Sequence, residues 1–208
     1  MLGMKVELSG FDGLKRKIDR LPAEMRDKAV RPAINKVAAK GTAELTRAIT
    51  DEYAVKASEV RNAVWVRKAH GDLLEAVITV FGSAKRRGRS LNLIHFLAAV
   101  QAAGKAHAVR GKRVSKADRA ALDKQLGFII KKAGGIKKIE GAFLGNKGRT
   151  VFIREGKGRL PIKPLQVIGF SQMFNSKRVS ARVMKKINDE LPVEVDRAIA
   201  MLLARGAL

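Results

Sequence analysis

Two long apolar stripes with helical spacing lie near opposite ends of this chain of 208 residues. The first lies in the segment from Pro22 to about Thr50, and its members are Val30, Ile34, Val37, Gly41, Leu45 and Ala48. The second lies between about Lys177 and Ala204, and its members are Val179, Val183, Ile187, Leu191, Val195, Ile199 and Leu202. A helix with such a stripe must bury one face. We therefore predict two long core helices, each with a kink or restart at its proline, Pro32 or Pro192.

Short segments with the alternation of β-strands lie between the stripes. We predict one hairpin from Trp65–Lys68 and Leu73–Phe81. A second hairpin is predicted from Lys138–Phe143 and Thr150–Arg154, with a glycine-containing turn between them. The predicted fold class is α+β, an antiparallel sheet of short strands packed by a long N-terminal helix and a long C-terminal helix. We expect residues 1–208 to form a single domain.

Smaller elements are less sharply indicated. Short helices are predicted over Phe11–Arg20 and Lys56–Ala63, and a strand is expected to begin at Phe128. Leu91–Val100 is apolar and fits either a strand or a helix, whereas Gly156–Pro164 has two prolines and reads as an extended loop.

Basic residues greatly outnumber acidic ones, with 43 Lys and Arg against 19 Asp and Glu and a formal net charge of +24. Residues 83–119 hold ten basic side chains and one acid, and residues 131–163 hold ten and two. Because such an excess repels itself, it indicates a polyanion or an acidic partner. We expect a basic mobile loop or insertion at about 83–119, since residues 101–116 lack large apolar anchors.

Seven basic residues in that insertion are the candidate contacts for duplex DNA or a protein partner: Lys85, Arg86, Arg87, Arg89, Arg110, Lys112 and Arg113. Phosphate contacts would give them attraction to DNA without sequence preference. An acidic neighbouring subunit or plain solvent remains the alternative for the 85–89 cluster. Aromatic residues are few, which disfavours stacking of single-stranded bases.

The sequence offers no catalytic constellation. The three histidines lie far apart, the acids are scattered and there is no cysteine. His95 lies in an apolar run and is expected to be a partly buried structural residue. We therefore assign no catalytic, cofactor-binding or metal-binding residue and expect no enzyme activity. The start of the chain lacks the pattern of a signal peptide, and no run approaches the ~18 apolar residues of a membrane span, so we expect no membrane association.

The order of several segments resembles the minor tail protein Z family of lambda-like phages and prophages. The resemblance covers about residues 28–204. The segments that carry it are Arg31–Ala38, Ile139–Phe143, Thr150–Gly156, Gly158–Ile162, Val167–Met173 and the late Leu191-Pro192. Leu160 stands where the family is expected to have an aromatic residue.

The resemblance implies a structural virion protein that completes the tail at its head-proximal end. It implies a homo-oligomeric ring, with six subunits as one option, that helps to join tail to head and surrounds or contacts DNA. The implied neighbours are tail-tube, tail-terminator or connector proteins, and assembly would take place in the host cytoplasm. The alternative is a sequence-independent nucleic-acid-binding protein unrelated to virions. Salt-dependent binding of nucleic acid by a monomer would favour this alternative.

Overall fold

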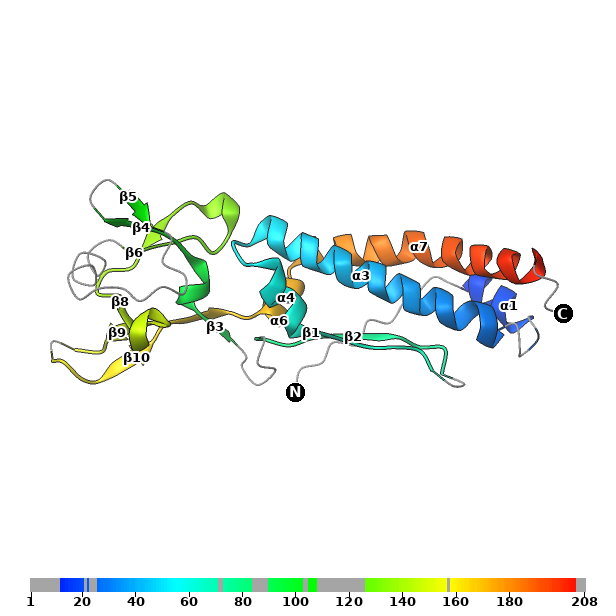
Figure 1. Ribbon diagram of the computed structural model, residues 1–208, viewed down its shortest axis with the longest axis horizontal. Coiled ribbons are helices and arrows are strands. Elements are labelled where there is room, and N and C mark those ends of the chain that lie inside the picture. Colours follow the sequence, from blue (N-terminus) through cyan, green and yellow to red (C-terminus); the bar gives the residue numbers. More distant parts are fainter. Residues whose placement is uncertain are drawn as a thin grey trace.

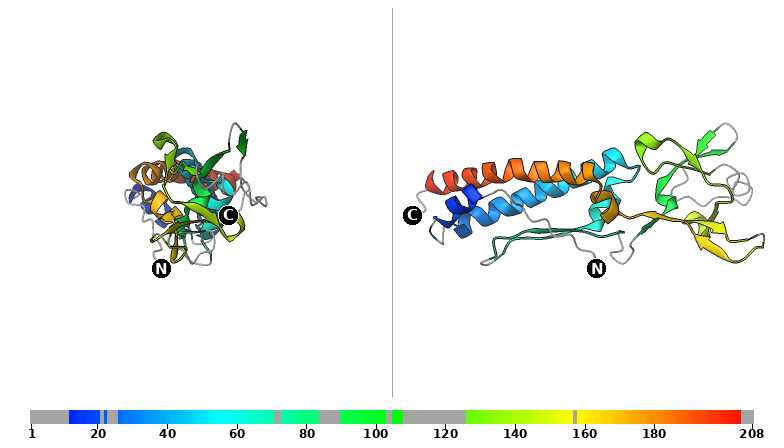
Figure 2. Two further views of the ribbon diagram at one scale, coloured as in Figure 1. Left: turned by 90° about the vertical axis from the view of Figure 1, so that its left-hand side faces the viewer. Right: turned by 180° about the vertical axis from the view of Figure 1, so that it is seen from behind.

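The computed structural model of the protein describes residues 12–20, 22, 26–70, 73–83, 90–102, 105–107, 126–156 and 158–204. Over these residues the molecule is elongated (Figures 1 and 2). Two long antiparallel helices, α3 (Arg31–Glu52) and α7 (Lys177–Ala204), form one half, and the strands of residues 64–67 and 77–80 lie beside them. The short strands between residues 90 and 168 form the other half. We call these the helical half and the strand half.

The helices follow the apolar periodicity of the sequence. Helix α7 has the predicted bounds, and the short helices α1 (Asp12–Asp19) and α4 (Ala57–Ala63) lie where they are predicted. A π-helical turn, Arg26–Val30, leads into α3. Pro32 occupies the first turn of α3, where the missing N–H has no helical partner to lose, so the predicted restart is confirmed there.

Pro192 behaves differently, because α7 runs through it without a restart. Proline in a helix interior costs about 3 kcal/mol. Helix α7 contacts α3 on both sides of this proline, through Ile187 before it and Glu194 after it. These tertiary contacts hold the helix in one piece against the local preference for a break.

Helices α3 and α7 pack closely against each other. A Cβ on Gly41 would lie 3.0 Å from the side chain of Ile187, so the glycine allows the two helices to approach. The apolar stripes supply buried residues to one contiguous core, among them Val37, Leu45 and Val183. The same core includes Phe96 and Phe128 of the strand half, which joins the two halves.

Among the described residues all strand pairs are antiparallel, as predicted, but the strands form four small sheets rather than one. The first sheet is the predicted hairpin of β1 (Val64–Arg67) and β2 (Val77–Val80). The second pairs β3 (Ser90–Asn92) with β11 (Gln166–Ile168). The third has the order β5-β4-β6-β7, with bounds Lys105–His107, Leu97–Ala102, Leu126–Phe128 and Lys137–Lys138. The fourth has the order β10-β9-β8, with bounds Ile162–Pro164, Thr150–Arg154 and Phe143–Gly145.

Several segments differ from the sequence-based expectation. The predicted strand Lys138–Phe143 is split, because a turn with Gly141 at φ +74° separates β7 from β8. Of these two strands, β8 pairs with β9, whereas β7 pairs with β6. Between β3 and β4 lies a 3-10 turn, Leu93–Phe96, so the segment 91–100 contains both strand and helical structure. A five-residue helix, α6 (Phe170–Phe174), precedes α7 and was not predicted.

Candidate functional site

The seven predicted contact residues, Lys85, Arg86, Arg87, Arg89, Arg110, Lys112 and Arg113, lie outside the described residues. The described part of the 83–119 insertion contains strands β3 to β5 and the 3-10 turn. The described residues that border its undescribed stretches are Ser83, which follows β2, Ser90, which begins β3, and His107, which ends β5. The mobility and the contacts of the insertion stay predictions.

The described part of the chain contains a second basic region, in the strand half. Its nine described basic side chains are all exposed: Lys131, Lys132, Lys137, Lys138, Lys147, Arg149, Arg154, Arg159 and Lys163. We call this set the basic strand region. Two of the nine have ion pairs in the described structure, Lys131 with Glu52 at 3.4 Å and Lys163 with Glu155 at 3.9 Å. Arg154 lies over the ring of Phe143, 4.5 Å from its centroid.

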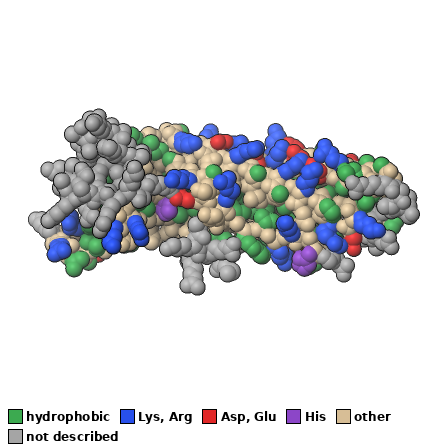
Figure 3. Space-filling view, in the orientation of Figure 1, with side chains coloured by type: hydrophobic (Ala, Val, Ile, Leu, Met, Phe, Trp, Pro, Cys, Tyr) green, Lys and Arg blue, Asp and Glu red, His purple; other side chains and the backbone are tan. Residues whose placement is uncertain are grey.

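The helical half has a different charge balance. Helix α3 contains four basic and three acidic residues, and α7 contains six and four. Figure 3 shows Asp and Glu side chains among the Lys and Arg side chains over this half. The net charge of the protein therefore comes mainly from residues 83–163, in the strand half and its insertion.

Several acids of the helical half form ion pairs between α3 and α7. Glu194 is buried, with 2% of its side chain exposed, and its carboxylate lies 2.8 Å from Lys36 Nζ and 2.5 Å from Lys40 Nζ. Hydrogen bonds from these two lysines lower the pKa of Glu194 to about 2. Lys186 and Lys40 likewise lower the pKa of Glu190. Glu190 and Glu194 are thus engaged by lysines of α3 and join the two helices.

A second cluster of ion pairs joins α3 and α7 toward the other end of the helix pair. Arg182 of α7 donates from Nε to Glu44 at 2.5 Å and from Nη1 to Asp51 at 2.7 Å. Both bonds raise the pKa of the Arg182 guanidinium, and the bond to Asp51 has the larger effect. Asp51 and Glu52, at the C-terminal end of α3, bind Arg182 and Lys131 respectively, which ties α3 to α7 and to the strand half.

The prediction that His95 is a partly buried structural residue is confirmed. His95 is partly buried, and its Nδ1 lies 3.2 Å from the carboxylate of Glu59. Within the described ranges no group of three or more His, Cys, Asp or Glu side chains could hold a metal ion. In the same ranges, no helix has the length and apolar character needed to cross a bilayer.

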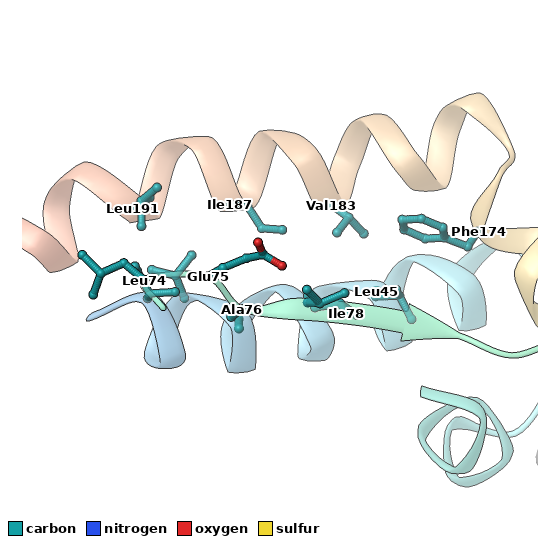
Figure 4. A pocket seen from close by; sticks show the side chains of 13 residues that line it. Leu45, Leu74, Glu75, Ala76, Ile78, Phe174, Val183, Ile187 and Leu191 are labelled. Carbon is teal, nitrogen blue, oxygen red and sulfur yellow. The ribbon is translucent and has the colours of Figure 1, made fainter. Parts of the chain in front are cut away.

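An apolar groove of about 440 Å³ lies between α3, α7 and residues 74–78 (Figure 4). Its walls are formed by Ile34, Val37, Ala38, Leu45, Leu74, Glu75, Ala76, Val77, Ile78, Phe174, Val183, Ile187 and Leu191. Asn35 of α3 fixes the hairpin beside the groove, since its side chain accepts from Ala69 N at 2.8 Å and donates to Ala69 O at 3.1 Å. The groove could not be predicted from the sequence because its walls come from three separate segments. The sequence shows the apolar pattern of each segment but not that the three lie together.

Comparison with known proteins decides the identity of the chain. A model of the prophage minor tail protein Z family matches residues 8–205. The chain belongs to this family. No curated protein and no solved structure matches it. The suspected resemblance is therefore confirmed, and the family makes the protein a structural component of a phage or prophage tail. Nearly the whole chain, including both long helices, lies within the match.

Proposed function

We propose that this minor tail protein forms a homo-oligomeric ring at the head-proximal end of the tail. The ring completes the tail and helps to join it to the head, and its neighbours are tail-tube, tail-terminator or connector proteins. The strand half faces the path of the DNA, and the helical half packs within the protein shell. Catalysis has no part in this function.

The segregation of charge supports the proposal. Four acids of α3 and α7 are engaged by lysines or arginines of the facing helix, namely Glu44, Asp51, Glu190 and Glu194, whereas only two of the nine side chains of the basic strand region have ion pairs in the described structure. Exposed lysines and arginines bind phosphates without reading sequence. A structure through which a whole genome slides needs that kind of contact, because a sequence-specific one would arrest the DNA.

The position in the virion can be tested by gold labelling. A tagged copy of the protein in assembled particles should place the label at the junction of head and tail. A lysogen lacking the gene should release filled heads and tails that do not join. Label along the tail or at its distal tip would contradict the proposal.

Contact with DNA can be tested by the salt dependence of binding. If about five phosphates are neutralised, log K should fall against log salt with a slope of about −4 to −5. Competition by unrelated duplexes should be equal. A slope near zero would mean that the basic strand region and the insertion face acidic protein surfaces instead.

A further inference from the structure

We propose that the apolar groove receives the Leu160 loop, residues Gly158–Lys163, of a second copy of this chain. This inference rests on the ring proposed above, and it supplies the contact between neighbouring subunits that such a ring needs.

The groove is the incompletely covered edge of the α3–α7 pair. On one edge the two helices are joined by the ion pairs of Glu190 and Glu194. On the other edge they present apolar side chains, and residues 74–78 cover these only in part. Ile34 and Leu191 of the two helices remain partly exposed there. An open apolar groove in a protein that functions within an assembly is a site at which a partner is expected to bind.

The Leu160 loop offers exposed apolar side chains on an ordered backbone. Leu160 is 72% exposed, which makes it the most exposed large apolar side chain of the described residues, and Ile162 is 38% exposed. The loop is fixed in place, since β10 pairs with β9 and Glu155 N donates to Pro161 O at 3.2 Å. A loop that is already ordered loses little conformational freedom when it binds.

The charges of the groove and of the Leu160 loop are also complementary. Glu75 is the single charged residue of the groove, and Figure 4 shows its carboxylate on the side of the strand that faces α7. Its Oε1 accepts from Arg67 at 2.7 Å, and within the described residues no ion pair involves Oε2. The Leu160 loop contains Arg159 and Lys163 on either side of its apolar residues, and Arg159 has no ion pair in the described structure. Insertion of Leu160 would bring Arg159 to the acidic rim of the groove.

The shape of the molecule makes this contact intermolecular. The Leu160 loop lies at the far end of the strand half, between β9 and β10, whereas the groove lies in the helical half (Figure 1). A chain this elongated cannot place its own loop in its own groove. A contact between two different patches is heterologous, so successive copies form a ring when the rotation closes.

Disulfide trapping tests the contact directly, because the natural chain has no cysteine. Leu160→Cys and Ala76→Cys are made as two separate variants and mixed under mild oxidation. We expect a disulfide-linked dimer that contains one copy of each variant. The matched control replaces Ala76→Cys by Leu203→Cys, on an apolar side chain of α7 that is 52% exposed and lies outside the groove. This control mixture should form no such dimer above background.

A second measurement asks whether the loop drives assembly. Leu160→Asp leaves the buried core untouched and should weaken self-association about thirtyfold, as expected for a central apolar anchor. Leu203→Asp is the control and should leave self-association unchanged. Sedimentation of both variants against the natural protein gives the association constants.

The outcomes separate this inference from the ring itself. A ring that forms without trapping, and that tolerates Leu160→Asp, would overturn the inference and leave the ring standing. Trapping into open chains without closed rings would support the contact and refute the ring. If Ala76→Cys is instead trapped by a tail-tube or terminator protein, the groove has a different occupant and the inference fails.

Discussion

Glu194 is the most deeply buried charge among the described residues, and its environment predicts how the protein responds to acid. Hydrogen bonds from Lys36 and Lys40 lower its pKa from 4.5 to about 2. The folded state therefore binds this proton less tightly than the unfolded state. The resulting stabilisation is fully present above pH 4.5 and is lost as the pH falls toward 2.

Replacing Glu194 by Gln should reduce stability at neutral pH and flatten its decline between pH 4.5 and 2. The amide cannot carry the charge that Lys36 and Lys40 stabilise. Urea midpoints measured across this range give the comparison, with Glu140→Gln as the control because Glu140 is exposed and has no ion pair in the described structure. Part of the slope should persist, since the pKa of Glu190 is also lowered. An unchanged acid profile in Glu194→Gln would show that this cluster does not hold the helices together.

Gly145 lies in the strand half at a position with no room for a larger side chain. A Cβ at this position would lie 2.7 Å from the ring of Phe152, which itself stacks on Phe143 at a centroid distance of 6.1 Å. Gly145→Ala should therefore destabilise the protein by about 1–3 kcal/mol through overpacking. Gly134→Ala is the matched control, because its Cβ would meet only Lys131 Cβ at 3.8 Å. Thermal unfolding of both variants measures the difference, and equal melting temperatures would contradict the prediction.

Helix α7 is the element on which local preference and tertiary structure disagree most clearly. Pro192 removes one backbone hydrogen bond from a helix that otherwise continues to Ala204. Pro192→Ala should restore that bond and stabilise the protein by about 1–3 kcal/mol. Circular dichroism during urea unfolding measures the change, with Ala198→Gly as an opposite control expected to cost about 1 kcal/mol. A loss of stability in Pro192→Ala would mean that the packing of α7 on α3 requires the proline.

The elements that the sequence predicts well are those set by local periodicity. The bounds of α7, the helix before Val64 and the hairpin turn at residues 145–148 all follow from patterns within a few residues. Pairings between distant segments could not be predicted in this way. Strand β11 pairs with β3, and Lys40 binds Glu190 and Glu194, although these partners are separated by more than seventy positions along the chain. The apolar groove depends on such pairings, which is why it appears only in the structure.

The same distinction holds for the candidate site. Charge counting located the excess of basic residues at 83–119 and 131–163, because charge needs no partner to be visible in a sequence. It could not show that Glu44, Asp51, Glu190 and Glu194 are engaged by cations of the facing helix, since this depends on how the helices face each other. The contrast between the two halves is therefore a property of the folded chain.

For the whole molecule, this contrast predicts that DNA binding depends on the strand half with its insertion and not on the helical half. Lys137→Gln with Lys138→Gln removes two exposed charges from the basic strand region. The slope of log K against log salt should become shallower by about 1.8, since each phosphate contact contributes about 0.9. Arg16→Gln with Lys185→Gln removes two exposed charges from the helical half and serves as the control. Both double variants have the same net charge, so a general loss of attraction would affect them equally. The control should bind with the natural slope. Equal slopes in the two variants would mean that DNA responds to total charge and that the strand half has no special role.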